Sequence, residues 1–372
     1  MRIVYFTHSL RSCWNHGNAH FLRGVLSELL ARGHDVSAYE PVGAWSLSNL
    51  LKDAGEAGLD PFRDNYPELE PIEYEPNADL SQMVDGADLV IVHEWNDPEL
   101  VAAIGRLRAR GARFTLLFHD THHRAVSAPE QMRAYDLDGY DGVLAFGATL
   151  ARVYQEWGWG GRVFVWHEAA DTRRFHPPVH EGEREGLVWI GNWGDDERSQ
   201  ELVDFLLRPA RDAGLPLDIY GVRYPDAAKR TLAEYSARYH GWVANAAAPA
   251  LFARHLATVH VPRRFYTAML PGIPTIRVFE ALACGIPLVS APWDDCEGLF
   301  EPGADFLVAR DGVRMQEHLK AILGDPFMAH ELADHGRKTI LARHTCAHRV
   351  DELLAIHAEL GASRDIPRKV SA

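Results

Sequence analysis

Short apolar runs alternate with amphipathic segments along the whole chain, and this alternation is the feature that most constrains the fold. It is typical of α/β folds built on parallel sheets. In the first half of the chain, strands are predicted at 2–6, 35–40, 87–92, 113–118, 142–146 and 162–166. A second series of strands is predicted at 186–191, 215–221, 257–261, 285–291 and 305–309. The two series predict two successive parallel sheets.

Helices are predicted between the strands wherever apolar residues recur at helical spacing. In 21–30 the apolar residues fall on one face, and Gly33 follows where a C-terminal cap belongs. The second half ends in three further predicted helices, at 313–323, 328–342 and 346–360.

The segment 171–186 interrupts the pattern with a Pro-Pro pair and a cluster of charges, so it is predicted to be a linker. A chain of 372 residues is long enough for two domains. We expect domains at 1–172 and 173–345, followed by a C-terminal helix and a frayed tail at 346–372. Two such domains imply a cleft between them, and ligands of open parallel sheets bind at the carboxyl ends of the strands.

Composition narrows the function classes. The formal charge of −14 and a pI near 5.8 argue against a general surface for nucleic acid or anionic membrane. The four cysteines form no C-x-x-C pair, and no apolar run approaches the roughly eighteen residues that span a bilayer. We therefore expect a cytoplasmic protein with reduced thiols. The basic run 106–113 is interpreted as a solvated helix face rather than a membrane-docking surface.

The stretch 261–292 is the most informative part of the sequence. Pro274 fits the first turn of a helix and Gly285 fits its end. The loop before this helix can present bare backbone N–H groups to an anion, and the helix dipole adds to the attraction. Arg277 and Glu280 share one face of the helix. Glu280 can accept two hydroxyl hydrogen bonds, as a ribose requires, and Arg277 can neutralise a diphosphate together with Arg263 or Arg264.

The string R-V-F-E-A-L-A-C-G-I-P-L-V, which begins at Arg277, resembles the donor-binding signature of GT-B glycosyltransferases. It is similar to the R-x-F-E-A-x-A-x-G pattern of the glycosyltransferase-like domain shared with the spore maturation protein CgeB. It also resembles the second half of the Glu-x7-Glu motif of the large retaining GT-B family. The first glutamate of that motif, which in that family contacts the transferred sugar, is replaced here by Gly272.

The resemblance extends to other strand ends. Residues 187–207 resemble the first donor-domain loop of the family, and 171–177 resemble its interdomain linker. The loop 9–20 resembles the glycine-containing loop that faces the donor phosphate. The resemblance implies a GT-B fold, with two Rossmann-like domains, a cleft between them and a C-terminal helix that packs back toward the N-terminal domain. The donor-binding residues that it implies are Gly17, Gly191, Asn192, Arg198, Arg264, Gly272, Ile273, Pro274, Thr275, Arg277 and Glu280.

His119 follows the fourth predicted strand, at a position that matches a functional histidine of the retaining family near the transferred sugar. A histidine there could bond a sugar hydroxyl or help to move the acceptor proton. The predicted catalytic residues are therefore His119, Arg277 and Glu280, whereas His122 and His123 are interpreted as structural. Since these histidines share one short loop without a helical H-E-x-x-H context, no metal site is predicted.

The function that follows from the resemblance is transfer of a sugar from a nucleotide-diphosphate sugar to a hydroxylated acceptor. We expect retention of configuration, no metal, and no cofactor besides the nucleotide sugar itself. The acceptor could be a glycan, a lipid-linked or a small molecule, but not a nucleic acid. If the enzyme inverts, it needs a base, and His20 or His119 is the candidate. The alternatives are a GT-B sugar-nucleotide epimerase and a catalytically decayed binding or structural protein.

Overall fold

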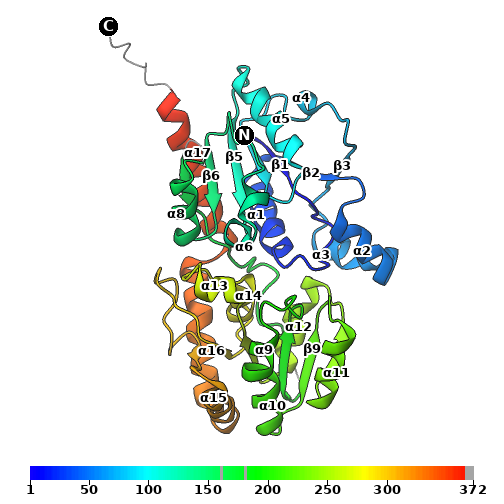
Figure 1. The fold of residues 1–372 in the computed structure, drawn as a ribbon, viewed down its shortest axis with the longest axis vertical. Helices are drawn as coiled ribbons and strands as arrows, with labels where there is room; N and C mark the ends of the chain where they lie inside the picture. The colour runs from blue at the N-terminus through cyan, green and yellow to red at the C-terminus, as the bar shows by residue number, and fades with distance from the viewer. Residues whose placement is uncertain (160–161, 180–181, 365–372) are drawn as a thin grey trace.

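The computed structural model describes residues 1–159, 162–179 and 182–364, and its strands form two parallel sheets. The sheets lie in two halves of the molecule, one above the other in Figure 1. The first half contains β1 (Arg2–Phe6), α1 (Ala19–Ala31), β2 (Asp35–Pro41), α2 (Trp45–Ala54), a 3-10 helix (Glu56–Leu59), α3 (Asp60–Asn65), β3 (Ile72–Tyr74), α4 (Leu80–Met83), β4 (Leu89–His93), α5 (Pro98–Ala109), β5 (Thr115–Asp120), α6 (Arg124–Ser127), α7 (Pro129–Met132), β6 (Gly142–Ala145), α8 (Ala148–Glu156) and β7 (Val163–Val165).

The second half has the same alternating organisation. It contains β8 (Leu187–Ile190), α9 (Ser199–Leu202), a π-helical turn (Val203–Leu207), α10 (Arg208–Asp212), β9 (Leu217–Tyr220), α11 (Asp226–Glu234), β10 (Arg238–Gly241), a 3-10 helix (Asn245–Ala247), α12 (Ala248–Arg254), β11 (Ala257–His260), α13 (Arg264–Ala268), α14 (Ile276–Ala283), β12 (Leu288–Ser290), β13 (Leu307–Val308), α15 (Gly312–Gly324), α16 (Pro326–Arg343) and α17 (Cys346–Arg364).

Strand order fixes where a ligand can bind. In the described residues the first sheet runs β3-β2-β1-β4-β5-β6-β7 and the second runs β10-β9-β8-β11-β12-β13. The order reverses between β1 and β4 in the first sheet and between β8 and β11 in the second. Ligands of open α/β sheets bind in the crevice at such a reversal, outside the carboxyl ends of the strands. The loops after β1, β4, β8 and β11 are therefore the places to look for a site.

The predicted strands are all present, with ends displaced by a few residues. Two strands were not predicted, β3 and β10, and both are outer strands with mostly exposed or half-buried side chains. They lack the apolar runs that reveal the central strands, which are buried on both faces. The helix predicted to start at Pro274 begins instead at Ile276, because Thr275 has extended φ/ψ angles and occupies the N-cap position.

The last helix returns to the first half of the molecule. α17 leaves the second half and packs against α1 and β5, beside β6 and α8 in Figure 1. The indole N–H of Trp166 donates to the carbonyl of Arg349 over 2.8 Å, and Val350 and Leu353 are fully buried. The C-terminal helix therefore packs as predicted. Of the tail predicted to be frayed, residues 365–372 lie outside the described part of the chain.

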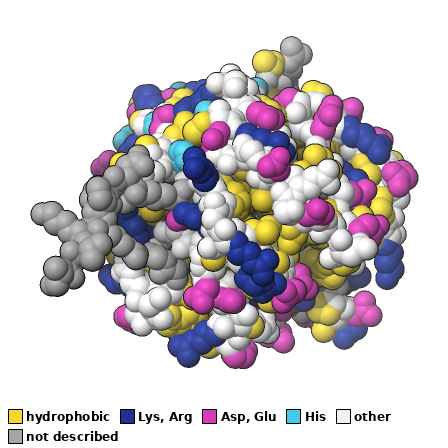
Figure 2. Space-filling view, turned by 90° about the horizontal axis from the view of Figure 1, so that it is seen from above, with side chains coloured by type: hydrophobic (Ala, Val, Ile, Leu, Met, Phe, Trp, Pro, Cys, Tyr) yellow, Lys and Arg dark blue, Asp and Glu magenta, His cyan; other side chains and the backbone are white. Residues whose placement is uncertain are grey.

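Charges are interspersed on the molecular surface. Figure 2 shows one end of the molecule with acidic and basic side chains side by side, and no continuous basic surface is visible on the described part of that face. Within the basic run 106–113, Arg106 pairs with Glu99 and Arg108 pairs with Asp141. This pairing agrees with a solvated helix face. No helix in the described part of the chain is long and apolar enough to cross a membrane.

Candidate active site

The loop after β1 contacts the second half of the chain where the two switch points face each other. Asn192 Nδ2 donates to Asn15 Oδ1 over 2.8 Å, and Asn245 Nδ2 donates to the carbonyl of Gly17 over 3.1 Å. A Cβ atom at Gly17 would lie 3.2 Å from Cγ2 of Ile276, at the start of α14. The structure thus brings the predicted residues Gly17 and Asn192 together, and Gly17 permits the close approach.

Arg198 is the most unusual group at this junction. Its side chain is buried, donates to the carbonyls of Val261 and Asn192 over 3.0 and 2.9 Å, and also donates to Asn192 Oδ1. Its Nε atom is buried and has no hydrogen-bond partner among the described residues. Burial, and then the neighbouring Arg263, lower the pKa of Arg198 to about 9, and Arg277 contributes in the same direction. The buried Arg198 thus lies close enough to the half-buried Arg263 and Arg277 for their charges to act on it.

Arg263 and Arg264 are adjacent in sequence but point to different places. Arg263 donates to Asn192 Oδ1 over 3.1 Å, beside Arg198, and pairs with Glu197. Arg264 is 55% exposed and pairs with Glu201 at the surface. The resemblance implies Arg264 as a donor-binding residue, but Arg263 is the one that lies beside Arg198.

Glu280 is fully buried at the contact between the two halves. Its Oε1 lies 2.8 Å from Nδ1 of His20 on α1, and its Oε2 accepts from Arg277. The backbone N–H of Asp171 donates to the other ring nitrogen of His20, Nε2, over 2.7 Å. Nε2 is therefore unprotonated, and Nδ1 carries the proton that is donated to Glu280. Both carboxylate oxygens of Glu280 are occupied by protein groups in this arrangement.

The loop before α14 is clamped against the first half. Gly272 has φ +89°, and a Cβ atom there would lie 2.6 Å from Sγ of Cys296. Ile273 is fully buried among apolar residues of the first half, and Thr149 Oγ1 donates to the carbonyl of Pro271 over 2.8 Å. Pro274 is also buried, whereas Thr275 is half-buried. The Ile273 side chain thus packs in the core. The backbone of residues 274–275, between Ile273 and α14, is the part of this loop that could contact a ligand.

Gly191 is required by close packing after β8. A Cβ atom there would approach the Trp189 ring to 3.0 Å, and the Gly191 carbonyl accepts from the hydroxyl of Tyr224 over 2.9 Å. The opposing Gly221 leaves no room either, since its own Cβ would lie 2.0 Å from the Gly191 carbonyl oxygen. These contacts fix the path of the chain into Asn192 and Arg198.

Two carboxylates at the junction were not predicted from the sequence. Glu168 follows β7, is 3% exposed and lies near the backbone N–H of Ile276. Glu297 accepts from the backbone N–H of Ala148 over 2.9 Å, and its other oxygen lies 3.1 Å from Nε2 of His167. Both lie in loops that follow strands, so the rule that selected the other site residues could also have found them.

The first half gathers histidines at the carboxyl ends of its central strands β1, β4 and β5. His119 is fully buried, its Nδ1 is hydrogen-bonded to the Tyr5 hydroxyl, and burial lowers its pKa to about 3. His93 lies 5.3 Å from His119 between ring centroids, and His8 lies 4.1 Å from His16. We call these four residues the histidine edge. Each has one buried ring nitrogen without a hydrogen-bond partner in the described part of the chain.

The two other histidines of the predicted loop have different neighbours, and Nε2 of His123 lies 3.4 Å from Oε2 of Glu197 in the second half. His123 is hydrogen-bonded to Ser127 over 2.9 Å and stacks on Phe265 at 4.9 Å, while His122 packs against Trp95. Within residues 1–159, 162–179 and 182–364, no group of three or more His, Cys, Asp or Glu side chains is arranged to hold a metal ion. Metal independence itself stays a prediction.

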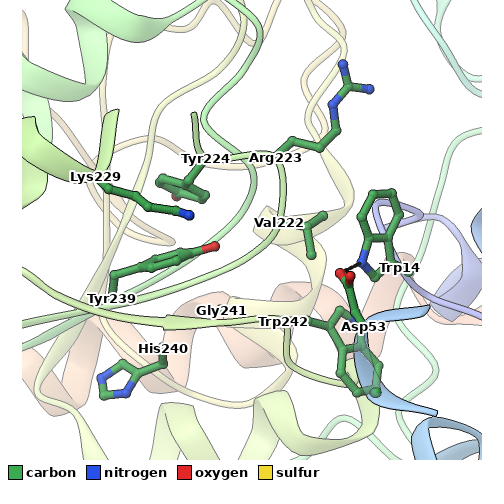
Figure 3. Close-up of a pocket in the computed structure, with 11 residues that line it drawn as sticks. Trp14, Asp53, Val222, Arg223, Tyr224, Lys229, Tyr239, His240, Gly241 and Trp242 are labelled. Atoms are coloured by element: carbon green, nitrogen blue, oxygen red, sulfur yellow. Dashed lines mark hydrogen bonds between the residues drawn. The ribbon is translucent and has the colours of Figure 1, made fainter. Parts of the chain in front are cut away.

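A pocket of about 460 Å³ opens between the two halves, beside the Gly191 turn. Figure 3 shows Trp14 and Asp53 from the first half on one side, and Tyr224, Lys229 and Tyr239 from the second half on the other. Trp14 donates to Asp53 over 2.6 Å. The loops after β9 and β10 form the wall of the pocket, so it lies at the carboxyl ends of the second sheet.

Both the sequence and the fold of this chain are similar to those of known proteins. Residues 198–355 match the family described as glycosyl transferase-like. The structure is similar to sucrose-phosphate synthase from Thermosynechococcus elongatus with a TM-score of 0.64, 14% identity and coverage of 98% of this chain and 100% of that chain. The chain has the GT-B glycosyltransferase fold. No curated protein matches the chain.

Two further GT-B structures contain a nucleotide or nucleotide sugar. An α-glucosyltransferase in complex with UDP and a 13-mer DNA has a TM-score of 0.66, 12% identity and coverage of 96% of this chain and 99% of that chain. The T4 phage enzyme BGT in complex with its UDP-glucose substrate has a TM-score of 0.56, 12% identity and coverage of 98% of both chains. The predicted GT-B fold is confirmed, and the glycosyltransferase class agrees with the family that the second half matches. The CgeB-like resemblance, the domain boundaries and the residue roles stay predictions.

Proposed function

We propose that the chain transfers a sugar from a nucleotide-diphosphate sugar to a hydroxylated acceptor, with the donor bound between the two sheets. The observation that carries this proposal is the arginine cluster, in which the buried Arg198 lies near the half-buried Arg263 and Arg277. Glu197 and Glu280 pair with two of these arginines, but Arg198 has no carboxylate partner within the described residues and retains an unpaired Nε.

A diphosphate supplies the charge that this cluster lacks. Burying a guanidinium beside two others is costly, as the lowered pKa of Arg198 indicates. Phosphate oxygens accept charge-assisted hydrogen bonds from arginine, often two at a time. The same cations stabilise the negative charge that grows on the leaving diphosphate as the glycosidic bond breaks. The N-terminus of α14 adds backbone donors on the same side.

The nucleoside fits the pocket of Figure 3. Tyr224 and Tyr239, 4.7 Å apart between ring centroids, and the nearby Trp242 offer aromatic surface for a base. The buried Nε1 atom of Trp242 has no partner in the described part of the chain and can donate to a base or ribose oxygen. Since UDP and UDP-glucose are named with the neighbouring structures, uridine is the first base to test.

We further propose retention of configuration and no catalytic metal. An inverting enzyme needs a base, for which the sequence suggested His20 or His119. Both ring nitrogens of His20 are hydrogen-bonded to protein groups, and His119 is fully buried, so neither is placed to take a proton from the acceptor. Retention without a protein nucleophile relies on positioning and charge stabilisation. The three arginines supply the positive charge for which a metal would otherwise be needed. NMR of the product anomer tests the stereochemistry.

The acceptor that the charge pattern favours is a neutral hydroxylated molecule. One neighbouring structure contains DNA, but this chain carries a formal charge of −14 and its charges are interspersed on the visible face. A polyanion requires a continuous basic surface.

The deciding experiment is a thermal-shift screen with UDP, GDP, TDP and CMP, alone and as their common sugar conjugates. At a hundredfold excess over the dissociation constant, binding stabilises the fold by about 3 kcal/mol, which gives a clear melting shift. Release of sugar from the selected donor without acceptor then distinguishes an enzyme from a binding protein. If no nucleotide raises the melting temperature, the proposed donor site is wrong.

A further inference from the structure

The Glu168 side chain lies near the backbone N–H of Ile276, at the N-terminus of α14. The residue is 3% exposed, and its Oε1 atom has no hydrogen-bond partner among the residues that the structure describes. A buried carboxyl oxygen without a hydrogen-bond partner destabilises the fold, and a bound ligand could supply the missing partner.

The two neighbouring carboxylates differ from Glu168 in this respect. Glu280 uses both oxygens, one with His20 and one with Arg277. Glu297 also uses both, one with the N–H of Ala148 and one with His167. Of these three carboxyl groups, Glu168 is the one with a buried oxygen that has no partner in the described part of the chain.

The position of Glu168 relative to the diphosphate site indicates what would bind. Arg277 lies on the first turn of α14, and Glu168 lies near the first backbone N–H of the same helix. In a nucleotide sugar, the sugar is attached directly to the second phosphate. A carboxyl group beside the diphosphate therefore lies within reach of the sugar hydroxyls.

Local space and charge agree with this assignment. The loop before α14 cannot bring a side chain to the sugar at Gly272, because a Cβ atom there collides with Cys296. Burial, followed by the neighbouring charge of Glu280, raises the pKa of Glu168. A protonated carboxyl group avoids repulsion by the diphosphate, and it can both donate to and accept from a hydroxyl.

We propose that Glu168 binds a hydroxyl of the transferred sugar and so contributes to the choice of sugar. This inference rests on the proposed function and deepens it. The residue reaches the donor from the segment that joins the two halves, so sugar recognition depends on the first half as well as on the second.

The test compares UDP with UDP-glucose and UDP-galactose by calorimetry, or GDP with GDP-mannose if the screen selects GDP. We expect Glu168→Gln and Glu168→Ala to bind the free diphosphate as the wild type does, within about twofold. The additional affinity that the preferred sugar confers on the wild type should fall by about tenfold or more, since a polar site loses discrimination when one partner is removed.

Glu297→Gln is the matched control, because its oxygens are already bonded to protein. We expect this variant to melt at a lower temperature while the affinity ratio of sugar nucleotide to free diphosphate is unchanged. If the Glu168 variants keep the wild-type ratio although the diphosphate binds, the role of Glu168 is refuted and the donor site stands. If no nucleotide binds the wild type, both proposals fail.

A second measurement does not depend on the folding of the variants. Donors that lack one sugar hydroxyl at a time are compared on the wild type. One deoxy position should cost about tenfold in affinity. If no single deoxy substitution weakens binding, Glu168 does not bind a sugar hydroxyl and the inference is overturned.

Discussion

The two faces that meet at the junction differ in their chemistry. The second half presents the arginine cluster of Arg198, Arg263 and Arg277, which is charged and incompletely paired. The first half presents the histidine edge, whose imidazoles are uncharged at neutral pH because burial lowers their pKa values. Both faces hold buried polar atoms without partners in the described part of the chain.

This difference separates two kinds of binding. Unpaired cations are stabilised by an anion, whereas uncharged imidazoles can donate to or accept from a hydroxyl without a change in net charge. Under the proposed function, the nucleotide diphosphate therefore binds the arginine cluster of the second half. The two faces are expected to respond to different perturbations.

Removal of Arg198 should have the largest effect on the charged face. Arg198→Ala is expected to weaken binding of the selected nucleoside diphosphate by about a hundredfold, because charge-assisted hydrogen bonds in a buried site are lost. Calorimetry measures the affinity, and the melting temperature without ligand shows whether the variant is folded. Affinity within threefold of the wild type in a folded variant would remove Arg198 from the site.

Acid should perturb the histidine edge instead. The pKa of His8 is lowered from 6.5 to about 4 by burial and by Arg124, so the unfolded chain binds more protons than the folded one between these pH values. The stability contribution is complete above pH 6.5 and is lost as the pH falls toward 4, by about 3 kcal/mol for His8 alone.

Urea unfolding of the wild type and of His8→Gln, followed from pH 7 to pH 4.5, checks this expectation. The variant should lose less stability over that range than the wild type, by about 2–3 kcal/mol. Parallel pH profiles would mean that His8 is not the uncharged, buried group described here.

Substitution of Arg263 and of Arg264 tests which of the two adjacent arginines belongs to the charged face. Arg263→Ala should weaken diphosphate binding by about tenfold, since Arg263 lies beside Arg198 on Asn192. Arg264→Ala should change it by less than about twofold, because an exposed ion pair contributes little. The reverse order of effects would restore the assignment made from the sequence.

The smallest effect is expected from removal of divalent metal. If the arginine cluster alone neutralises the leaving diphosphate, donor turnover in excess EDTA should match turnover in added magnesium or manganese. A loss of turnover in EDTA that returns with one metal would show that the cluster is insufficient.

The fold could be predicted well from the sequence because the central strands are continuous apolar runs and the helices show apolar residues at helical spacing. The misses, β3 and β10, are outer strands that are mostly exposed or half-buried and lack an apolar run. In the site, Asn192 and Arg198 could be found because they follow a strand. The choice between Arg263 and Arg264 could not be made, since it depends on the residue at which α13 begins.

Long-range pairing was beyond what the sequence could reveal. His20 and Glu280 are 260 positions apart, and nothing local in either segment indicates that they bond to each other. Glu168 is a different case, because it follows a predicted strand and was passed over although the same rule applied. The strand-end rule should therefore be applied to every strand of a sheet, including those nearest a linker.

The return of α17 to the first half has a consequence for how the protein folds during synthesis. The apolar face of α17, including Val350 and Leu353, completes the core around Phe21 and Trp166. The first half of the chain therefore leaves the ribosome with part of its core uncovered, and that surface remains open until α17 has been synthesised. Contacts of such long sequence separation slow folding and prolong exposure to aggregation. Removal of α17 should then destabilise the half that was synthesised first.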